Sequence, residues 1–312
     1  MRAGRAAVVV ALAAAGLVGC TTAGDDAEPL PSGVAQGLTA ELRQDRTQYA
    51  DHRAKLHVVN GSDETVTLLG GALDAPGYGP SSPDGPVRAR TLAPGAGRDV
   101  RLRLGEVDCD AAPPAALAGA DAQTTPVATA TVLLAAGAAP SSTTGADGGD
   151  GGTAVEVQVT DPLARLAAVH REACAERLVA SGVTLRVTDV RGAQVPAPGG
   201  DAPGGRITLA VDPVAGGPDV RLVEISGTTL LSPAAGHAWT GDDLAGQADG
   251  QVVLDVVPAR CDPHVVAEDK RGTFLPVHAE VDGARQPEVY VPMTDQQRAA
   301  VYDLVHDACG WG

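Results

Sequence analysis

The feature that most constrains this chain is an internal repeat. A stretch from Val252 to Cys309 and an earlier stretch from Val100 to Cys174 contain the same parts in the same order. Each has an alternating run that leads to a cysteine, a β-like run, a second run reading E-V-x-V, and a Thr-Asp pair that opens an amphipathic helix ending at Ala-Cys. Because a duplicated unit folds twice, the repeat predicts two tandem modules of one architecture.

Each module contains short runs that alternate apolar and polar residues, with turn signals between them. In the first module these runs are Leu38–Leu42, Lys55–Val59, Glu64–Leu69, Val87–Leu92, Asp99–Leu104, Thr129–Leu134 and Ala154–Val159. In the second module they are Val183–Val187, Ile207–Val211, Val220–Ile225, Thr228–Leu231 and Gln251–Val257. Strands at this spacing predict an immunoglobulin-like or related β-sandwich, so the chain is expected to be mainly β (α+β).

The turn residues predict how some of these strands are connected. Asn60-Gly61 predicts a β-hairpin over Lys55–Leu69, and a second hairpin is expected over Val220–Leu231. The Gly/Pro-rich stretch Gly192–Gly205 is expected to interrupt the sheet as a loop. Residues 137–153 (GAAPSSTTGADGGDGGT) correspond to a short turn in the second module, so they are expected to be a disordered surface insertion.

A helix is predicted to close each module. In the first helix, Asp161 is the expected N-cap and Pro162 occupies the first helical position. In the second, Thr294 with Gln297 three residues later has the spacing of a capping box. The residues expected to face the core are Leu163, Leu166, Ala167, Val169 and Ala173 in the first helix and Val301, Leu304, Val305 and Ala308 in the second. A helix of about 14 residues with so modest an apolar stripe is marginal alone, so each helix needs a covalent link to its module.

Four of the five cysteines belong to the two modules, and the repeat selects one of the three ways to pair them. Each copy contributes one cysteine after its alternating run and one at the end of its helix. The expected disulfides are therefore Cys109–Cys174 and Cys261–Cys309, each inside its own module. Closing loops of these lengths would contribute on the order of 4 kcal/mol apiece, less any strain.

The same cysteines allow a second interpretation. Cys261-x-x-His264 and His306-x-x-Cys309 together offer four ligands of the kinds found in a zinc site with two cysteines and two histidines. The first copy keeps both cysteines and lacks both histidines at the matching places. A pair of disulfides predicts that pattern and a duplicated zinc site does not. No metal is therefore expected, with His264 and His306 as the alternative.

The N-terminus carries an export signal. Arg2 and Arg5 form a positive region, and Ala6–Leu17 is an apolar run too short to be a permanent membrane span. The run ends in Leu17-Val18-Gly19-Cys20, which resembles the lipobox of bacterial lipoproteins. The resemblance implies that Cys20 is diacylated and becomes the first mature residue. The alternative is an ordinary cleaved secretory signal in which this cysteine has no role.

The predicted organisation is a signal peptide at residues 1–19, the lipidated cysteine and a flexible tether at 20–36, the first module at 37–180 and the second module at 181–312. Loss of the signal peptide removes two arginines, so the formal charge changes from −16 to −18. Such an acidic chain is a poor partner for nucleic acids or an anionic membrane surface, so the expected membrane contact is through lipid. Arginine outnumbers lysine 21 to 2, which indicates high-GC coding, as in actinobacteria.

Residues 261–283 (CDPHVVAEDKRGTFLPVHAEVDG) resemble stretches of uncharacterised actinobacterial lipoproteins of the cell envelope. Together with the lipobox, this resemblance implies an extracytoplasmic protein of tandem build, anchored by lipid at the outer face of the cytoplasmic membrane. It implies no activity.

The sequence contains no visible arrangement of a nucleophile with a base, so the chain is expected not to be an enzyme and to need no cofactor. His237, in Gly-His-Ala-Trp-Thr, is expected to be a solvated loop residue. The favoured hypothesis is a non-catalytic binding or scaffolding protein of the cell envelope, with an envelope protein or a small ligand as its partner. Metal binding through His264 and His306 is the second hypothesis, and an enzyme of unrecognised type is the third.

Overall fold

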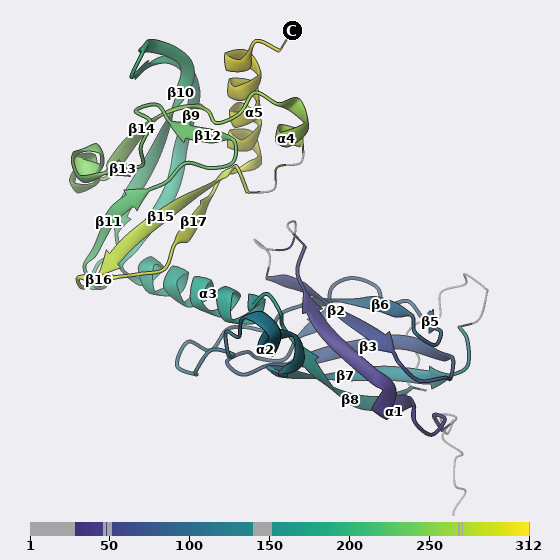
Figure 1. The fold of residues 1–312 in the computed structure, drawn as a ribbon. Coiled ribbons are helices and arrows are strands. Elements are labelled where there is room, and N and C mark those ends of the chain that lie inside the picture. The colour runs from purple at the N-terminus through teal and green to yellow at the C-terminus, as the bar shows by residue number, and fades with distance from the viewer. Residues whose placement is uncertain are drawn as a thin grey trace, which may run out of the picture.

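The computed structural model describes residues 29–45, 48, 52–139, 152–267, 269 and 271–311. The chain is mainly β, and the expected architecture of two sandwich modules, each followed by a helix, is confirmed (Figure 1). The predicted signal peptide, Cys20 and most of the 137–153 insertion lie outside the described residues. Within the described ranges, no helix is both long and apolar enough to cross a membrane.

The first module consists of β1 (Leu38–Arg43), β2 (Arg53–Asn60), β3 (Val66–Asp74), β4 (Ser82–Pro83), β5 (Arg90–Leu92), β6 (Gly97–Arg103), β7 (Ala128–Ala136) and β8 (Thr153–Thr160). They pair in the order β4-β6-β2-β1-β8-β7-β3-β5. β1 and β8 meet in parallel over two residue pairs, and the sheet folds there into two halves. A Cβ atom on Gly71 of β3 would lie 3.7 Å from Leu56 of β2 and 3.9 Å from Val100 of β6, so the halves pack face to face.

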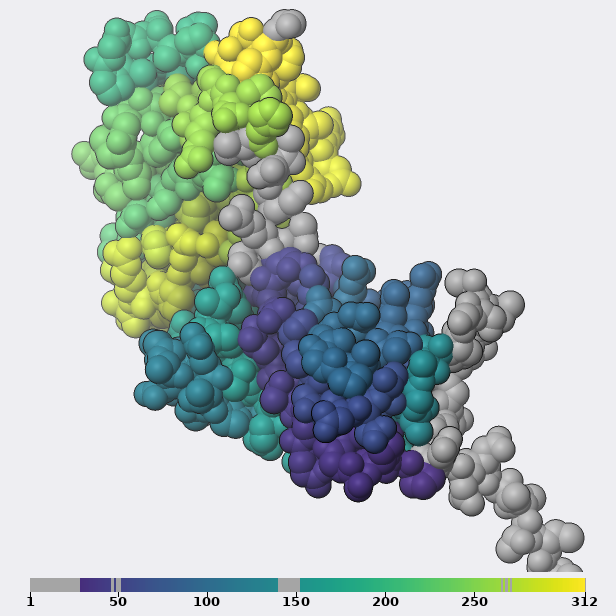
Figure 2. All heavy atoms as spheres, turned by 45° about the vertical axis from the view of Figure 1, so that its right-hand side comes forward, coloured from purple at the N-terminus to yellow at the C-terminus, as the bar shows by residue number. Residues whose placement is uncertain are grey.

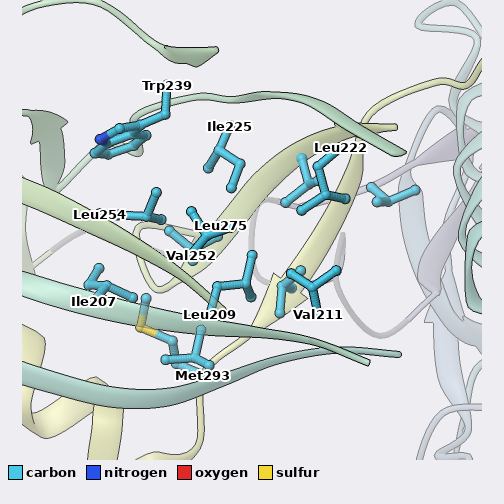
Figure 3. Packing of buried hydrophobic residues seen from close by; sticks show 14 of the residues in the cluster. Ile207, Leu209, Val211, Leu222, Ile225, Trp239, Val252, Leu254, Leu275 and Met293 are labelled. Carbon is cyan, nitrogen blue, oxygen red and sulfur yellow. The ribbon is translucent and has the colours of Figure 1, made fainter. Parts of the chain in front are cut away.

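The second module consists of β9 (Val183–Ala197), β10 (Gly200–Pro213), β11 (Val220–Ile225), β12 (Leu231–Pro233), β13 (Trp239–Thr240), β14 (Gln251–Pro258), β15 (Phe274–Val281), β16 (Ala284–Arg285) and β17 (Val289–Pro292). One sheet has the order β12-β14-β10-β9, and in the other β11 lies between β13 and β15, with β16 and β17 both paired to β15. Figure 3 shows the core between them, where Ile207 and Leu254 of one sheet pack with Ile225 and Leu275 of the other.

The two modules match strand for strand. The halves β4-β6-β2-β1 and β5-β3-β7-β8 of the first correspond to β12-β14-β10-β9 and β13-β11-β15-β17 of the second. Both have the D-E-B-A and C-F-G strand orders of an immunoglobulin sandwich, with one short strand added beside C. The repeat therefore covers whole modules, although the part visible in the sequence begins only at β6 and β14.

The hairpin predicted over Lys55–Leu69 is wrong. β2 pairs with β1 and β6, whereas β3 pairs with β5 and β7, so the chain crosses from one half of the sandwich to the other between them. Asn60 is fully buried, and its Nδ2 donates to the carbonyl oxygens of Glu64 at 2.7 Å and Leu92 at 3.0 Å. The Asn60 side chain therefore links the segment that crosses between β2 and β3 to β5, and it does not close a two-residue turn.

The hairpin predicted over Val220–Leu231 is wrong for the same reason. β11 pairs with β13 and β15, whereas Leu231 begins β12, which pairs with β14 in the other sheet. Thr228 redirects the chain between them. Its Oγ1 accepts hydrogen bonds from the backbone N–H groups of Leu230 at 3.1 Å and Leu231 at 3.0 Å.

The loop predicted at Gly192–Gly205 is also wrong, because these residues continue the sheet. β9 and β10 pair from their connecting turn to Pro213 opposite Val183. β14 pairs with β10 only from Gly205 onward, so among the described strands the tip of this hairpin is a two-stranded ribbon. Proline is tolerated at such an edge where its nitrogen faces away from the partner strand, because its missing N–H then removes no ladder hydrogen bond.

The helices are α1 (Val34–Gly37), α2 (Gly119–Thr124), α3 (Arg165–Gly182), α4 (Pro263–Ala267), α5 (Asp295–Cys309) and the 3-10 helix η2 (Gly241–Asp249). The capping box predicted for the second closing helix is present at the start of α5. α3 begins later than predicted: Pro162 and Leu163 lie in a turn, and Leu163 is 66% exposed and does not face the core. The N-cap residue is Ala164 and not Asp161 as predicted, but the Asp161 Oδ2 accepts from the backbone N–H of Leu166 in the first turn at 2.8 Å.

α3 belongs to both modules. Leu166 and Val169 in its first half pack in the core of the first module, whereas Ala175 and Val179 pack in the core of the second. The modules lie at the two ends of this helix (Figure 1), and the space-filling view shows them as two bodies, one purple to teal and one green to yellow (Figure 2). The chain thus passes from one module to the other through a continuous helix.

Candidate functional site

Both disulfides are present in the predicted pairing. The Cα atoms of Cys109 and Cys174 lie 5.5 Å apart, and those of Cys261 and Cys309 lie 5.4 Å apart. Each bond ties the segment after β6 or β14 to the helix after β8 or β17, which is the equivalent place in the two copies. Disulfides of this kind are typical of proteins that fold in an oxidising compartment. Cys20, the predicted lipid-bearing residue, lies outside the described residues.

The alternative zinc site is not formed. Cys261 and Cys309 are joined to each other, so neither offers a thiolate to a metal. His264 is exposed, and His306 is exposed with its Nδ1 3.2 Å from Asp307 Oδ1 and its ring edge-on to Trp311 at 6.2 Å. Across the described ranges, no three His, Cys, Asp or Glu side chains form a group that could hold a metal.

A group of buried polar side chains lies next to the first disulfide. His170 of α3 is 4% exposed, with its Nε2 3.0 Å from the carbonyl oxygen of Asp108 and its Nδ1 3.8 Å from Cys174 Sγ. Tyr78 packs edge-on against the imidazole at 5.9 Å, and its hydroxyl donates to the carbonyl oxygen of Leu166 at 2.6 Å. Burial raises the pKa of Tyr78, so the phenol remains a neutral donor. These contacts hold α3 against the segment after β6, which is a structural role.

His237 is exposed in its loop, as expected, and its Nδ1 lies 3.0 Å from the carbonyl oxygen of Ala238. The neighbouring Trp239 is buried in the second core. The tryptophan of this pair therefore packs in the module, and the histidine faces solvent.

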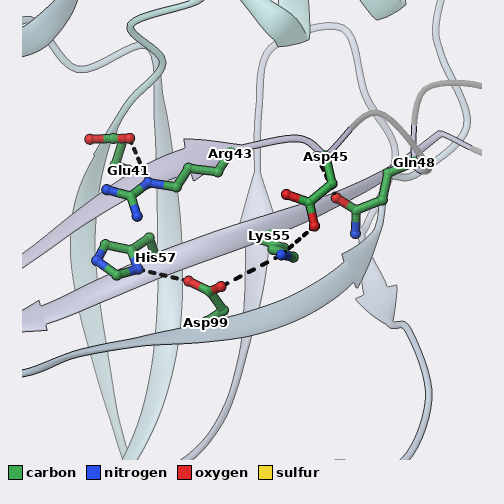
Figure 4. A network of polar contacts seen from close by, with 7 residues as sticks. All are labelled: Glu41, Arg43, Asp45, Gln48, Lys55, His57 and Asp99. Atoms are coloured by element: carbon green, nitrogen blue, oxygen red, sulfur yellow. Dashed lines mark hydrogen bonds and ion pairs between the residues drawn. The ribbon is translucent and has the colours of Figure 1, made fainter. Parts of the chain in front are cut away.

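A chain of charged side chains lies on the solvent-facing side of β1, β2 and β6 (Figure 4). Asp99 lies between His57, at 2.7 Å from its Nδ1, and Lys55, at 3.8 Å from its Nζ. Lys55 also forms an ion pair with Asp45. These charges compensate one another across three segments of the sheet, so the network leaves little net charge for a ligand.

A groove of about 600 Å³ lies beside this network, at the open side of the first sandwich. β6 pairs with β2 along its whole length but with β4 only at Leu102 and Arg103. Its outer edge at Arg98–Arg101 therefore carries no other described strand. The groove follows this edge, and Leu68 and Val100 contribute apolar surface to its lining.

The segment from Asp84 to Arg90 crosses the open side and forms the opposite wall of the groove. It leads from β4, in one half of the sandwich, to β5 in the other. The backbone N–H of Asp84 donates to the carbonyl oxygen of Arg101 at 3.0 Å, which fixes the segment to the edge of β6. Val87 lies over β3, since a Cβ atom on Gly70 would be 3.3 Å from it. Both walls are therefore part of the fold.

Most charged side chains that line this site, which we call the arginine groove, are basic. They are Lys55, Arg88, Arg90, Arg98 and Arg101, together with two acidic residues, Asp84 and Asp99. Both carboxylates have partners of their own: Asp84 lies 3.5 Å from Arg53 and 3.8 Å from Arg103, while Asp99 pairs with His57 and Lys55. The acidic residues of the groove are thus occupied by cations other than its arginines.

The four groove arginines have no ion pair with any described residue. Arg98 donates from Nη1 to the carbonyl oxygen of Gly97 at 2.9 Å, a contact between neighbours in the chain. All four are exposed residues that line the groove, with Arg98 on the face of β6 that carries Val100 and Arg101 on the face that carries Asp99.

These arginines are not predicted to form a site. Their local signal is weak: Arg-x-Arg at 88–90 and Arg-x-x-Arg at 98–101, in two separate runs. The runs become the two walls of one groove only because the segment between β4 and β5 crosses from one half of the sandwich to the other. The signal that would have found them is the density of arginines in an acidic chain.

No protein-family model matches the chain, and no curated protein matches it. Among solved structures, the D0-D1 domain of intimin has 12% sequence identity and a TM-score of 0.15, covering 82% of this chain and 97% of that one. The exo-chitosanase CsxA of Amycolatopsis orientalis has 10% identity and a TM-score of 0.16, covering 77% of this chain and 25% of that one. TM-scores this low do not establish a shared fold, so neither protein informs the function of this one.

Proposed function

We propose that this chain is a lipid-anchored extracytoplasmic protein that acts by binding or scaffolding at the cell envelope and not by catalysis. A diacyl group on Cys20 would hold it at the outer face of the cytoplasmic membrane. The tether is shorter than the predicted range of 20–36, because Val34 of α1 is buried in the first core and Leu30 packs against that core. The residues before Leu30 would let the modules stand away from the surface. The actinobacterial lipoproteins that it resembles have this location. The two disulfides support export, because such bonds persist in oxidising compartments.

The observation that carries the proposal is the coupling of the two modules by α3. Leu166 and Val179 are buried in different cores, although one helix holds both. Bending this helix between the modules would expose apolar side chains to water, so the helix resists it. Two modules in a fixed relation suit a scaffold, whose task is to present partners at set positions.

A polar cluster beside α3 reinforces this coupling. Arg271, just before β15, donates to Glu172 Oε1 of α3 at 3.2 Å, and its guanidinium lies 4.4 Å from the ring centroid of Tyr290 in β17. The Tyr290 hydroxyl donates to Glu288, and burial raises the pKa of Tyr290 to about 12. The cluster therefore ties the middle of α3 to the second module through an ion pair and a cation–π contact.

Membrane fractionation tests the anchor. The full-length chain should sediment with membranes and partition into detergent, whereas Cys20→Ala should appear largely in the soluble extracytoplasmic fraction, because it loses the acceptor of the lipid. A Cys20→Ala chain that stays with membranes to the same extent as the wild type would contradict the anchor.

Capture of partners from intact envelopes tests the scaffold. After mild crosslinking and detergent extraction, the wild-type chain should retain specific envelope components that a lipidated tether without the modules does not. Glu176→Pro, which interrupts α3 at an exposed position, is the matched variant, since it keeps both modules but removes their fixed relation. Recovery of nothing above the tether control would contradict a binding or scaffolding role.

A further inference from the structure

We infer that the arginine groove is a binding site for a small multivalent oxyanion, a ligand that carries two or more phosphate or carboxylate groups. The inference deepens the proposed function and rests on it, because it names the class of ligand that the first module takes.

The charge of the groove opposes that of the whole chain. Five basic and two acidic side chains line it, a formal charge of +3, in a protein whose formal charge is −16. Elsewhere, arginines lie beside carboxylates, as Arg206 does with Asp255 at 2.7 Å and Arg221 with Glu280 at 2.7 Å. High-GC coding accounts for arginine in place of lysine, but not for the gathering of unpaired arginines in one groove. Such a cluster is suited to bind an anion from outside the chain.

The two walls of the groove require more than one negative group. Arg88 and Arg90 come from the crossing segment, and Arg98 and Arg101 come from the edge of β6. A guanidinium presents its N–H donors as a planar fork that matches a carboxylate or a phosphate. A single small anion would engage one wall and leave the other without a partner. A ligand with two or more oxyanion groups can bridge both.

The lining and size of the groove favour a small ligand. Leu68 and Val100 are largely buried, and the apolar surface that they add weakens the solvent screening of charges bound beside it. The volume of about 600 Å³ is that of a small-molecule site, of roughly 300–1,000 Å³.

Two sources offer this chemistry, a soluble anion and the headgroup of an anionic lipid. The groove belongs to the module next to the predicted anchor, and the 14 residues from Cys20 to Gly33, before buried Val34 of α1, span at most about 50 Å when extended. Both sources are therefore within reach, and the experiment has an arm for each.

Calorimetric titration of the chain from residue 20, carrying Cys20→Ser and with its disulfides formed, is the direct test. Pyrophosphate or citrate should bind at least about tenfold more tightly than acetate, and added NaCl should weaken the binding. Arg88→Gln combined with Arg101→Gln removes one cation from each wall and should lower the affinity by about tenfold or more. Thermal unfolding should be unchanged, because both side chains are exposed.

The matched control is Arg186→Gln combined with Arg221→Gln. These arginines are also exposed, but they lie in the second module beside Asp212 and Glu280, so the affinity should not change. Sedimentation with phosphatidylglycerol vesicles is the second arm. Vesicle binding that the groove variant abolishes assigns the site to a lipid headgroup, whereas binding of pyrophosphate or citrate alone assigns it to a soluble ligand.

Three results would overturn the inference: no binding in either arm, binding that the groove variant retains in full, or an equal loss in the control. None of these touches the scaffold proposal, which fractionation and partner capture test without the groove. Failure of the anchor would likewise leave anion binding in solution intact.

Discussion

Asp161 shows how a single side chain fixes the start of α3. It is 3% exposed, and its Oδ2 accepts from the backbone N–H of Leu166 at 2.8 Å. Asp161→Ala would leave this N–H buried without a partner, so we expect the free energy of unfolding to fall by about 1–2 kcal/mol. Urea unfolding followed by circular dichroism measures the loss. Asp295→Ala removes an exposed aspartate from the first turn of α5 and should cost less than about 1 kcal/mol, so equal losses would contradict this role of Asp161.

Glu172 gives the chain a specific pH dependence. Burial raises its pKa, and Arg271 opposes the rise. A carboxyl group whose pKa is higher in the folded than in the unfolded state favours folding when protonated. Its contribution is complete below the ordinary glutamate pKa of about 4.3 and is lost as the pH rises through the raised value.

Glu172→Gln removes this titration and keeps a similar shape. Relative to the variant, the wild type should therefore gain stability as the pH falls from neutral toward about 4. The difference between their free energies of unfolding across a pH series measures the effect. A difference that is constant with pH, or that grows as the pH rises, would contradict it.

At the scale of elements, the two disulfides differ in what they hold. Cys261–Cys309 closes 48 residues and Cys109–Cys174 closes 65, so loss of either should cost on the order of 4 kcal/mol less strain. The local effect should differ, because α5 ends the second module whereas α3 is packed in both cores. Replacing Cys261 and Cys309 by alanine should therefore fray α5. Replacing Cys109 and Cys174 by alanine should not fray α3.

Hydrogen exchange of the helical amides distinguishes these outcomes. In the variant with Cys261→Ala and Cys309→Ala, protection should fall along α5, including the amides near buried Val301 and Val305. In the variant with Cys109→Ala and Cys174→Ala, the second half of α3 should remain protected. Equal loss of protection in the two helices would contradict the difference in their packing.

The sequence predicts the elements of this fold well and the pairing of its strands poorly. Alternation identified β1, β2, β6 and β14, and the capping box identified the start of α5. Alternation cannot say whether consecutive strands lie side by side or face each other across a core, because the apolar residues point inward in both cases. Asn60 is predicted to be a turn residue and Thr228 to begin a strand, yet their side chains stabilise crossings between sheets.

The same limit explains why the arginine groove was not predicted. Arg88 and Arg101 belong to runs that alternation predicts to be separate strands. Only the crossing of the chain from β4 to β5 brings them to one site. The cysteines could be paired from the sequence because the repeat supplied the long-range information that local patterns lack.

At the scale of the whole molecule, the two modules share one architecture but differ in the role of the helix that follows the last strand. Both copies place a helix after their last strand and bind it by a disulfide, but α5 ends its module whereas α3 continues into β9. The cores differ accordingly: His170 occupies, under its disulfide, the place that Val305 takes in the second copy. The closing helix of the first module has therefore become the link between the two.

Interrupting that link should separate the modules without unfolding them. Glu176 is exposed in α3, between Val169 of the first core and Val179 of the second. Glu176→Pro removes one backbone hydrogen bond and clashes with the preceding turn, at a cost of about 3 kcal/mol or more. Each sandwich keeps its own strands and disulfide, so both modules should stay folded but no longer unfold together. Thermal unfolding should therefore split into two transitions. X-ray scattering should give a larger radius of gyration, because the modules no longer keep a fixed relation. Glu176→Ala, which favours the helix, should leave both measurements unchanged, and a proline variant with the wild-type scattering profile would show that contacts other than α3 hold the modules together.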